Sequence, residues 1–452
     1  MARLFGTDGV RGVANVEPMT AETILQIGRA TAYVCKRHAR SHSRHRIVIG
    51  KDTRVSGYML ESALTAGICS MGANVFLVGP MPTPGIAFIT RSMRADAGMV
   101  ISASHNPYQD NGIKIFSRDG YKLPDGEEDE IEGLIASGHI RDIRPTAEEI
   151  GKAHRIDDAL GRYIVFCKDA FQLEDDLDGM RIVIDCANGA TYKVAPIILS
   201  EMGARVTALH CAPDGLNINR DCGSQHTADL RAAVTEAQAD IGLAFDGDGD
   251  RLIVVDERGR ELSGDHVLAV CAKELKDRGE LAGNVVVPTV MANFGFFRAM
   301  KRLGIECAVA PVGDRYVLET MRAKGAVLGG EASGHMIFLR HHTTGDGLIT
   351  ALQFLEVMRR TGRRASELAS IVTMTPQTLI NVTVARKPPI EEVAPLRAAI
   401  GEAERRLGDE GRVLVRYSGT QSMCRVMVEG PTEEVTASIA ESLAGTVRRA
   451  LG

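Results

Sequence analysis

The sequence predicts an α/β fold with three topologically related α/β domains that carry mixed sheets, followed by a smaller α+β C-terminal domain. Two observations predict it. A unit made of a β-branched run, a Gly- or Asn-containing loop, a helix-like stretch and a second β-branched run occurs three times. After residue 373 the pattern changes to short strands interleaved with two long amphipathic stretches. At 452 residues the chain is also too long for one compact core.

The three copies are related at a distance. The first runs from RIVIGKDTRVSG at residue 46 to MGANVFLVGP at residue 71, and the second from RIVIDCANGA at residue 181 to MGARVTALHCAPDG at residue 202. The third runs from NVVVPTVMAN at residue 284 to LGIECAVAPVGD at residue 303. Continuous apolar strands are typical of a sheet buried on both faces. Because the copies lie more than 100 residues apart, they indicate domain duplication and not a solenoid.

Polar stretches predict the domain boundaries. RDIRPTAEEIGKAHRIDD (141–158), DERGRELSGD (256–265) and TMTPQTL (373–379) are the candidate junctions. The predicted domains are therefore 1–157, 158–257, 258–372 and 373–452. The last would be built from strand-like LINVTVA, RVLVRYSG and CRVMVEG with helix-like VAPLRAAIGEAERRL and TEEVTASIAESLAGTVRRAL.

Composition argues against several classes of protein. The net charge of −5 without a long basic run gives no support for nucleic-acid or membrane-surface binding. The chain has no Trp and only 4% aromatic residues, so stacking platforms for bases are not expected. Nine cysteines without a C-x-x-C pair favour a reducing compartment. With no signal-like N-terminus and no apolar run near 18 residues, we expect a cytoplasmic protein.

The strongest local signal is IGLAFDGDGDRLIVVD (241–256), in which Asp246, Asp248 and Asp250 alternate with glycines between two apolar runs. Three carboxylates so close repel one another, and a cation would relieve the repulsion. In a straight strand they would spread over about 13 Å, so the glycines must let the loop curl. Hard carboxylate oxygens favour Mg²⁺ over zinc.

Two other interpretations of this loop stay open. In a calcium EF-hand, Glu257 would take the twelfth position, but Arg251 stands where glycine is required and the flanks are strand-like. An Asp-Gly hairpin turn without a ligand would need one Asp-Gly pair, not two followed by a third aspartate.

Four further loops carry candidate chemistry. In VISASHNPYQDNGIKIF (100–116), Asn106-Pro107 favours a turn, and a hairpin-like connection is the simplest local interpretation. In VRYSGTQSMCRVM (415–427), backbone N–H groups and guanidinium groups could hold an anion. FGTDGVRG (5–12) and VLGGEASGHMIF (327–338) are small-residue loops with polar side chains. Each of the four alone is also compatible with a plain turn.

Taken together, SASHNP (102–107), DGDGDR (246–251), GEASGH (330–335) and RYSGT (416–420) make the chain resemble the α-D-phosphohexomutases over essentially its whole length. The resemblance implies four domains around a central cleft. FGTDGVRG and PDGLNINRDCGSQH (213–226) are most similar to the bacterial branch that interconverts glucosamine 6-phosphate and glucosamine 1-phosphate. That step leads toward UDP-N-acetylglucosamine and cell-wall precursors.

The resemblance also implies residue roles. Ser104 would be the phosphorylated residue, and one Mg²⁺ per subunit would be held by a phosphoseryl oxygen on Ser104 with Asp246, Asp248 and Asp250. Four residues would move protons or stabilise the phosphoserine: Arg11, His105, Lys114 and His335. The substrate would be bound by Arg251, by Glu331 and Ser333 at the sugar hydroxyls, and by Arg416, Ser418, Gly419, Thr420 and Arg425 at the phosphate that is not transferred.

Two positions depart from the family pattern. Gln421 and Ser422 stand where Glu and then Pro or Asn usually follow the Ser-Gly-Thr core. Ala332 stands where the glucosamine branch often has Gln and its relatives Met, so this position does not identify the sugar.

The mechanism implied is that of an isomerase. Phosphorylated Ser104 would donate its phosphoryl group to a small phosphosugar, glucosamine 1,6-bisphosphate would turn over in the cleft, and its other phosphoryl group would return to Ser104. A homodimer is possible. The alternatives are a phosphomannomutase/phosphoglucomutase, a phosphosugar phosphatase that admits water, and a non-catalytic phosphosugar sensor.

Overall fold

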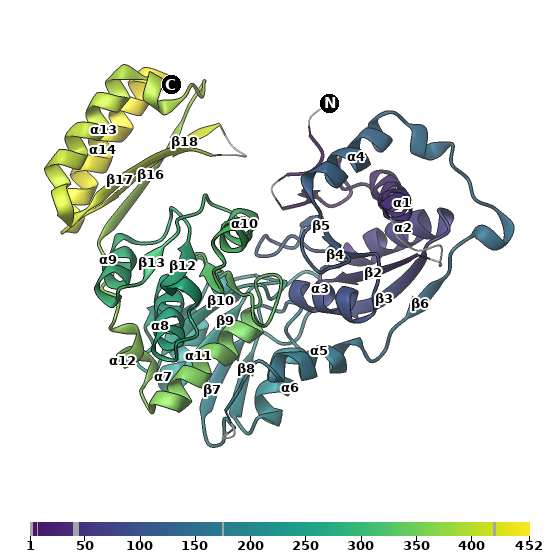
Figure 1. Cartoon of the computed structure of the whole chain (residues 1–452), viewed down its shortest axis with the longest axis horizontal. Coiled ribbons are helices and arrows are strands. Elements are labelled where there is room, and N and C mark those ends of the chain that lie inside the picture. The colour runs from purple at the N-terminus through teal and green to yellow at the C-terminus, as the bar shows by residue number, and fades with distance from the viewer. Residues whose placement is uncertain (1–2, 7, 39–44, 174–175, 419–421) are drawn as a thin grey trace. The chain divides into compact units, whose positions relative to one another are not determined.

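The computed structural model describes residues 3–6, 8–38, 45–173, 176–418 and 422–452, and the chain divides into two compact units. Unit 1 comprises Met1–Met291 and Ile305–Ile371, and unit 2 comprises Ala292–Gly304 and Val372–Gly452. In Figure 1 the chain runs through the three sheets of unit 1 and the sheet of unit 2, and it ends in a helix, α14 (Glu433–Leu451).

The first sheet of unit 1 is mixed. Its strand order is β1 (Val10–Val13), β5 (Asp110–Ser117), β4 (Ala97–Ile101), β2 (Arg46–Lys51), β3 (Asn74–Pro80) and β6 (Ala153–Arg155). The helical segments of this region are α1 (Ala21–His38), α2 (Gly57–Ser70), α3 (Thr83–Ser92), α4 (Asp125–Ala136), η1 (His139–Arg141) and η2 (Ala147–Glu149).

Strand β2 explains why both faces of this sheet are covered. Ile47 and Ile49 point into the core that α1, α2 and α4 build on one face. Gly50 points the other way, where an added Cβ would lie 2.5 Å from Ile86 of α3. Alternation along a strand thus places helices on both faces, as continuous apolar strands predict.

The second sheet has the order β11 (Glu261–Leu262), β10 (Leu252–Asp256), β9 (Ile241–Phe245), β7 (Arg181–Asp185) and β8 (Arg205–Leu209). Its helical segments are α5 (Ala159–Lys168), α6 (Val194–Glu201), α7 (Ala228–Glu236) and η3 (Gly223–Gln225). Strand β11 joins this sheet although it follows residue 257, where we predict the second domain to end.

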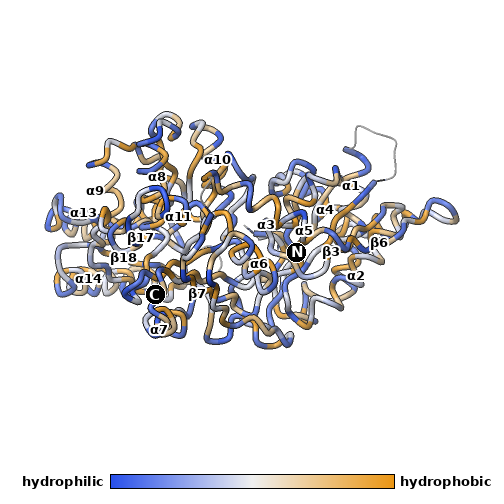
Figure 2. Tube along the Cα trace, turned by 90° about the horizontal axis from the view of Figure 1, so that it is seen from below, coloured by the Kyte–Doolittle hydropathy of each residue, from blue (hydrophilic) through white to orange (hydrophobic). Residues whose placement is uncertain are grey.

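The third sheet has the order β13 (Glu306–Cys307), β12 (Val285–Pro288), β14 (Leu328–Gly330) and β15 (Met336–Phe338). Its helical segments are α8 (Gly264–Asp277), α10 (Asp314–Lys324), α11 (Gly347–Thr361), α12 (Ala365–Ala369) and η4 (Ala282–Asn284). Asp346 caps α11 by accepting the N–H groups of Leu348 and Ile349. The helix is buried along its length from Gly347 to Met358, and its apolar residues are orange in Figure 2.

Unit 2 is an antiparallel sheet covered by helices. The strand order is β16 (Gln377–Thr383), β18 (Met423–Glu429) and β17 (Arg412–Tyr417), and the helical segments are α9 (Phe294–Leu303), α13 (Ala394–Leu407), α14 (Glu433–Leu451), η5 (Ile390–Glu392) and η6 (Gly408–Glu410). Val426, Leu396 and Leu443 are buried in one core between sheet and helices. Asn293, the N-cap of α9, donates to Thr375 O at 3.0 Å.

The structure confirms the predicted fold class. Each predicted repeat forms a pair of parallel strands joined by a helical connection, β2–β3, β7–β8 and β12–β13, and antiparallel strands make all three sheets mixed. The C-terminal strands and helices form the smaller α+β part. Among the described helices, none combines the length and apolarity that a membrane crossing requires. The exact domain boundaries stay a prediction.

Candidate active site

Ser104 lies just beyond the carboxyl end of β4, in the loop that leads to β5. Its side chain is 1% exposed and its backbone has a φ of 53°, a left-handed conformation that costs a non-glycine residue free energy. Ser104 N donates to Ser102 Oγ at 2.9 Å, and Ser102 Oγ donates to Asp52 Oδ2 at 2.6 Å. The loop is hairpin-like because β4 and β5 pair antiparallel, with Ile101 opposite Ile113. The turn therefore places Ser104 at the end of the sheet where the parallel strands β2 and β4 finish.

A fully buried arginine, Arg54, donates hydrogen bonds to the backbone carbonyls of this loop. Its Nη2 donates to Ser104 O at 3.0 Å and to Asn106 O at 2.8 Å, and its Nη1 donates to Asp110 O at 3.0 Å and to Pro107 O. Its Nε donates to Asp52 Oδ2 at 2.8 Å, so the buried charge is paired. One guanidinium group thus fixes the carbonyls around Ser104 and stabilises the strained backbone.

The loop is also held from the second sheet. Asn219 Nδ2 donates to Ser104 O at 2.9 Å and to Asn106 O at 3.0 Å. Sequence reasoning used the 213–226 stretch only as a family marker. In the structure, the Asn219 side chain joins the Ser104 loop to the loop that follows β8.

We expect Arg54→Met to destabilise the protein by about 3–5 kcal/mol, because it leaves the Asp52 carboxylate buried and unpaired. Any catalysis that depends on Ser104 should fall with it, since the Ser104 loop loses its carbonyl contacts. Urea unfolding and initial rates measure the two effects. Arg46→Met, at the exposed start of β2, the strand that precedes Arg54, is the control and should change stability by under about 0.5 kcal/mol. An Arg54→Met protein as stable as the wild type would contradict this role, and the double variant with Asp52→Asn should recover part of the loss.

Asp246, Asp248 and Asp250 are brought together in the loop between β9 and β10. One carboxylate oxygen of each lies within 4.8 Å of the others, and all three residues are buried. Gly249 has a φ of 72°, and a Cβ on Gly247 would lie 2.6 Å from Ser104 O. The glycines therefore allow both the curl of the loop and its close approach to Ser104.

The structure also decides between the interpretations of this loop. Strands β9 and β10 pair antiparallel with Phe245 opposite Leu252, so the hairpin is real and the helices of an EF-hand are replaced by strands. The hairpin and the convergence of carboxylates are one feature, because the second Asp-Gly and the third aspartate curl inward within the connection.

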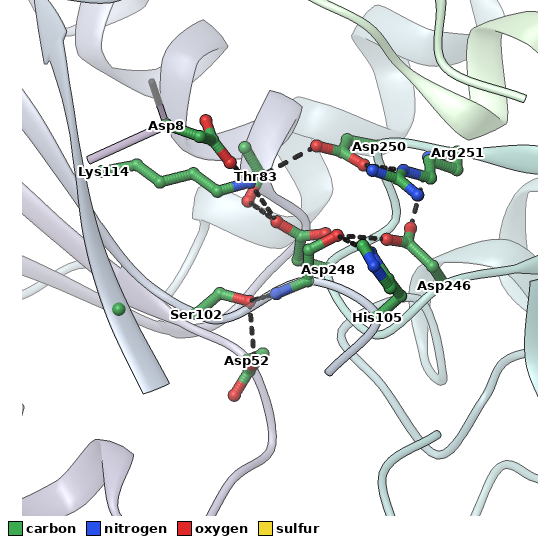
Figure 3. A network of polar contacts seen from close by, with 12 residues as sticks. Asp8, Asp52, Thr83, Ser102, His105, Lys114, Asp246, Asp248, Asp250 and Arg251 are labelled. Atoms are coloured by element: carbon green, nitrogen blue, oxygen red, sulfur yellow. Dashed lines mark hydrogen bonds and ion pairs between the residues drawn. The ribbon is translucent and has the colours of Figure 1, made fainter. Parts of the chain in front are cut away.

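The aspartate loop lies beside the Ser104 loop, of which Figure 3 shows Ser102 and His105. Ser104 Oγ donates to Asp246 Oδ2 at 2.6 Å, and Thr83 Oγ1 donates to Asp248 Oδ2 at 2.6 Å. Burial, followed by the charges of Asp250 and Asp248, raises the pKa of Asp246 well above its usual range. Asp248 Oδ1 and Asp250 Oδ1 are buried with no hydrogen-bond partner in the described residues. Buried carboxylate oxygens that accept no hydrogen bond, in an all-oxygen donor set, fit a hard divalent cation.

Lys114, on β5, supplies the positive charge nearest to the aspartates. Its Nζ lies 2.9 Å from Asp248 Oδ2, 3.4 Å from Asp250 Oδ2 and 3.4 Å from Asp8 Oδ2. Burial lowers its pKa, but these three carboxylates outweigh burial and raise the pKa of Lys114 well above its usual range. His105 Nδ1 lies 3.3 Å from Ser104 Oγ, and burial followed by Arg251 and Arg11 lowers the pKa of His105 to about 4.

Six side chains close a ring of alternating charge beside Ser104, which we call the charge ring: Asp8, Lys114, Asp250, His335, Asp314 and Lys122. Lys122 pairs with Asp8 and lies 2.6 Å from Asp314 Oδ2. The two nitrogens of His335 lie 3.7 Å from Asp250 Oδ2 and 3.7 Å from Asp314 Oδ2. Against burial, the carboxylates raise the pKa of His335 to about 9. Arg11 extends the ring through an ion pair with Asp8.

The charge ring joins segments far apart in the chain. Lys114 and Lys122 come from the first sheet region, Asp250 from the aspartate loop, and Asp314 and His335 from the third sheet region. Sequence reasoning named Arg11, Lys114 and His335 separately and missed Asp8, Lys122 and Asp314. Buried charges are stable only when they are paired. The carboxylates of the ring therefore explain how Lys114, Lys122 and His335 can be held beside Ser104.

The remaining sugar-site candidates of unit 1 lie in the loop between β14 and β15 and at the start of β10. Glu331 Oε1 accepts the N–H of Gly313 at 3.0 Å, and Ser333 is two residues further along this loop. Arg251 makes an antiparallel bridge with His335, and its Nε lies 3.8 Å from Asp250 Oδ1. Arg251, Glu331 and His335 therefore belong to the surroundings of the aspartate loop.

In unit 2, two predicted phosphate-binding arginines face each other. Arg416 on β17 and Arg425 on β18 are direct cross-strand partners, and burial followed by the charge of Arg425 lowers the pKa of Arg416. Lys387 Nζ donates to Ser418 O at 2.7 Å, which adds a third cation. Neighbouring guanidinium groups repel each other, and an anion between them would relieve the repulsion. Gly419 and Thr420 lie outside the described residues.

Comparisons with known proteins agree with this architecture. Four domain families of phosphoglucomutase/phosphomannomutase match the chain: α/β/α domain I at residues 2–141, α/β/α domain II at 162–259, α/β/α domain III at 263–374 and the C-terminal domain at 379–446. The chain is 58% identical to the phosphoglucosamine mutase of Syntrophobacter fumaroxidans over 452 residues, 100% of both chains. It is also 58% identical to the phosphoglucosamine mutase of Syntrophus aciditrophicus, again over 100% of both chains.

Solved structures share the fold at lower identity. A phosphoglucomutase/phosphomannomutase family protein from Burkholderia thailandensis superposes with a TM-score of 0.82 at 24% identity, covering 99% of this chain and 97% of that chain. The N-acetylphosphoglucosamine mutase of Aspergillus fumigatus, in complex with GlcNAc-6P and magnesium, gives a TM-score of 0.67 at 18% identity and covers 99% and 96%. The chain belongs to the phosphoglucomutase/phosphomannomutase family and is an isomerase of the phosphohexomutase type.

Proposed function

We propose that the chain is a phosphoglucosamine mutase that interconverts glucosamine 6-phosphate and glucosamine 1-phosphate through a phosphoserine on Ser104 and glucosamine 1,6-bisphosphate. The observation that carries the chemistry is the contact of 2.6 Å between Ser104 Oγ and Asp246, within a converging set of three aspartates. The choice of sugar is supported by the full-length relatives of that name at 58% identity. The product would supply UDP-N-acetylglucosamine and cell-wall precursor synthesis.

The proposed roles follow from placement. Ser104 carries the phosphoryl group, and its loop is held rigid by Arg54 and Asn219, which keeps the oxygen aligned for transfer. Lys114 and Arg251 place positive charge beside the transferring group. His105, at 3.3 Å from Ser104 Oγ, and Lys114 are the candidates for moving the substrate proton. His335 and Arg11 hold the charge ring around them.

The proposed cofactor is one Mg²⁺ per subunit, held by Asp246, Asp248, Asp250 and the phosphoryl oxygen on Ser104. When bound, such a cation neutralises charge on the phosphoryl oxygens. The donor set supports it, because three buried carboxylates without a soft ligand fit Mg²⁺ better than zinc. Without a cation the same carboxylates depend on Lys114 and Thr83 for compensation.

The remaining roles concern the substrate. Glu331 and Ser333 would bind sugar hydroxyls, and Arg416, Ser418, Gly419, Thr420 and Arg425 would bind the phosphate that is not transferred. The cross-strand arginine pair supports the second role. A cytoplasmic location, a homodimer and the domain ranges 1–157, 158–257, 258–372 and 373–452 complete the proposal.

Substrate preference tests the proposal. We expect kcat/KM for glucosamine 6-phosphate to exceed that for glucose 6-phosphate and mannose 6-phosphate by at least roughly tenfold, about 1.4 kcal/mol in barrier. A coupled assay for each 1-phosphate, run beside an assay for inorganic phosphate, measures both outcomes. A preference for mannose or glucose would make the chain a phosphomannomutase/phosphoglucomutase, and stoichiometric phosphate release would make it a phosphatase.

A further inference from the structure

A second group of ligand-type side chains lies in the second sheet region, outside the roles described above. Asp185 ends β7, His210 follows β8, and Cys222 lies in the loop that precedes η3. Strands β7 and β8 are parallel with Asp185 opposite Leu209, so their carboxyl ends meet at one edge. One carboxylate oxygen, one imidazole nitrogen and the thiol sulfur all lie within 4.8 Å of one another.

The group is buried and held in place. Asp185 and Cys222 are 0% and 1% exposed, while the His210 side chain retains 26% exposure. Asp185 Oδ1 accepts the N–H of Ala187 at 2.8 Å, and its Oδ2 accepts the N–H of Gly223 at 2.8 Å. His210 Nδ1 lies 3.0 Å from Asp185 Oδ2. The carboxylate is therefore fixed by its own loop after β7 and by the segment next to Cys222, with lone pairs remaining on each oxygen.

The loops that present these side chains are strained. Five non-glycine residues in them have positive φ: Ala187 (53°), Asn188 (48°), His210 (49°), Asn219 (57°) and Asp221 (54°). Each such residue costs free energy and persists only where surrounding contacts require it. Asn219 must reach Ser104 O, which explains part of the strain. His210 O accepts the N–H of Asn188 at 2.7 Å, so the strained backbone of His210 is tied to the loop that follows β7.

The electrostatic surroundings are acidic. Burial and then the charges of Asp185, Asp221 and Asp229 raise the pKa of Cys222 to about 12. His210 Nε2 lies 3.4 Å from Asp229 Oδ2, so this carboxylate orients the ring from outside. A bound cation would compensate the negative charge of the carboxylates around the Cys222 thiol, and its binding would release the thiol proton to solvent.

We propose that Asp185, His210 and Cys222 form a second cation site that binds a borderline transition metal, with Zn²⁺ the expected ion. Mixed oxygen, nitrogen and sulfur donors select such a metal, whereas the all-oxygen set of Asp246, Asp248 and Asp250 selects Mg²⁺. Three protein ligands leave one position for water. The site ties the ends of β7 and β8 to the loop that carries Asn219, and so it stabilises a support of the Ser104 loop.

Cobalt substitution in the full-length protein tests the site with a readout independent of catalysis. Chelator-treated, reduced protein is titrated with Co²⁺, and thiolate-to-cobalt charge transfer is followed by absorption. We expect one equivalent to give this band, which the aspartate loop cannot produce because it has no sulfur ligand. Zn²⁺ should abolish the band, and competition with a chromophoric chelator gives its affinity.

Matched variants assign the ligands. Cys222→Ser and His210→Gln should each weaken Zn²⁺ binding by more than roughly 100-fold, beyond the effect of losing an outer hydrogen-bond partner. Cys307→Ser, which alters a half-buried thiol on β13, should leave binding unchanged. Absence of the thiolate band in the wild type would overturn the proposal. So would a band that survives Cys222→Ser, or one that is lost in Cys211→Ser while Cys222→Ser retains it. His210→Gln keeps the test decisive if Cys222→Ser fails to fold, and neither result depends on the sugar preference.

Discussion

Ser104→Ala is expected to lower mutase activity by more than roughly a thousandfold, at least about 4 kcal/mol in the reaction barrier. The expected cause is the loss of the hydroxyl that donates to Asp246 and would carry the phosphoryl group. The substitution removes one oxygen whose hydrogen bonds are to the aspartate loop and His105, so the fold should be retained. Initial rates and intact-mass analysis measure the activity and the loss of the phosphorylated species.

Ser62→Ala is the matched control, since this α2 serine only donates to the Tyr58 carbonyl one turn earlier. It should be phosphorylated and active like the wild type. A Ser104→Ala protein with full activity would contradict the phosphoserine mechanism. A loss of circular dichroism in that variant would instead mean that the hydroxyl is needed for folding.

Asp248→Asn is expected to lower both Mg²⁺ affinity and kcat, each by roughly 100-fold or more. Loss of an outer partner of a metal ligand already costs 10–100-fold, and this change removes a charge from the donor set itself. The same change removes a carboxylate that accepts from Thr83 and pairs with Lys114. Mg²⁺ titration of the rate and direct calorimetry measure the two effects. Chelator treatment of the wild type should abolish activity, and Mg²⁺ should restore it.

Asp240→Asn is the control for this prediction. Asp240 precedes the same strand, β9, that the aspartate loop follows, and its contacts are with the exposed residue Arg181. It should leave the Mg²⁺ dependence unchanged. If Asp248→Asn kept the wild-type Mg²⁺ affinity, the aspartate loop would not be the metal site.

Local pattern was sufficient for much of the fold and for the main side chains. Three β-branched runs separated by helix-like stretches predicted parallel strand pairs, because a strand-helix-strand unit has few other ways to bury its apolar faces. Two Asp-Gly pairs followed by a third aspartate predicted converging carboxylates, which the glycine conformations of the β9–β10 hairpin allow. Ser104 and the aspartate loop could be related because both follow apolar strands, where ligands bind in such sheets.

Pattern was not sufficient for residues whose partners are remote in the chain. Arg54 is one basic residue among many in the sequence, and only the folded loop shows its guanidinium group beneath the Ser104 carbonyls. The signal that could have found it is the placement of Asp-Thr-Arg directly after β2, at the same sheet edge as Ser104. Lys122 and Asp314 are 192 residues apart, and no local spacing connects them.

The central claim is that Ser104 hands its phosphoryl group to a sugar phosphate. The most direct measurement is a single turnover in which enzyme carrying an isotopically labelled phosphoserine is mixed with unlabelled glucosamine 6-phosphate and Mg²⁺. We predict that the label maps to Ser104 before mixing and afterwards appears in glucosamine 1,6-bisphosphate and the monophosphates. Label that stays on the protein, maps to another residue or leaves as inorganic phosphate would contradict the account.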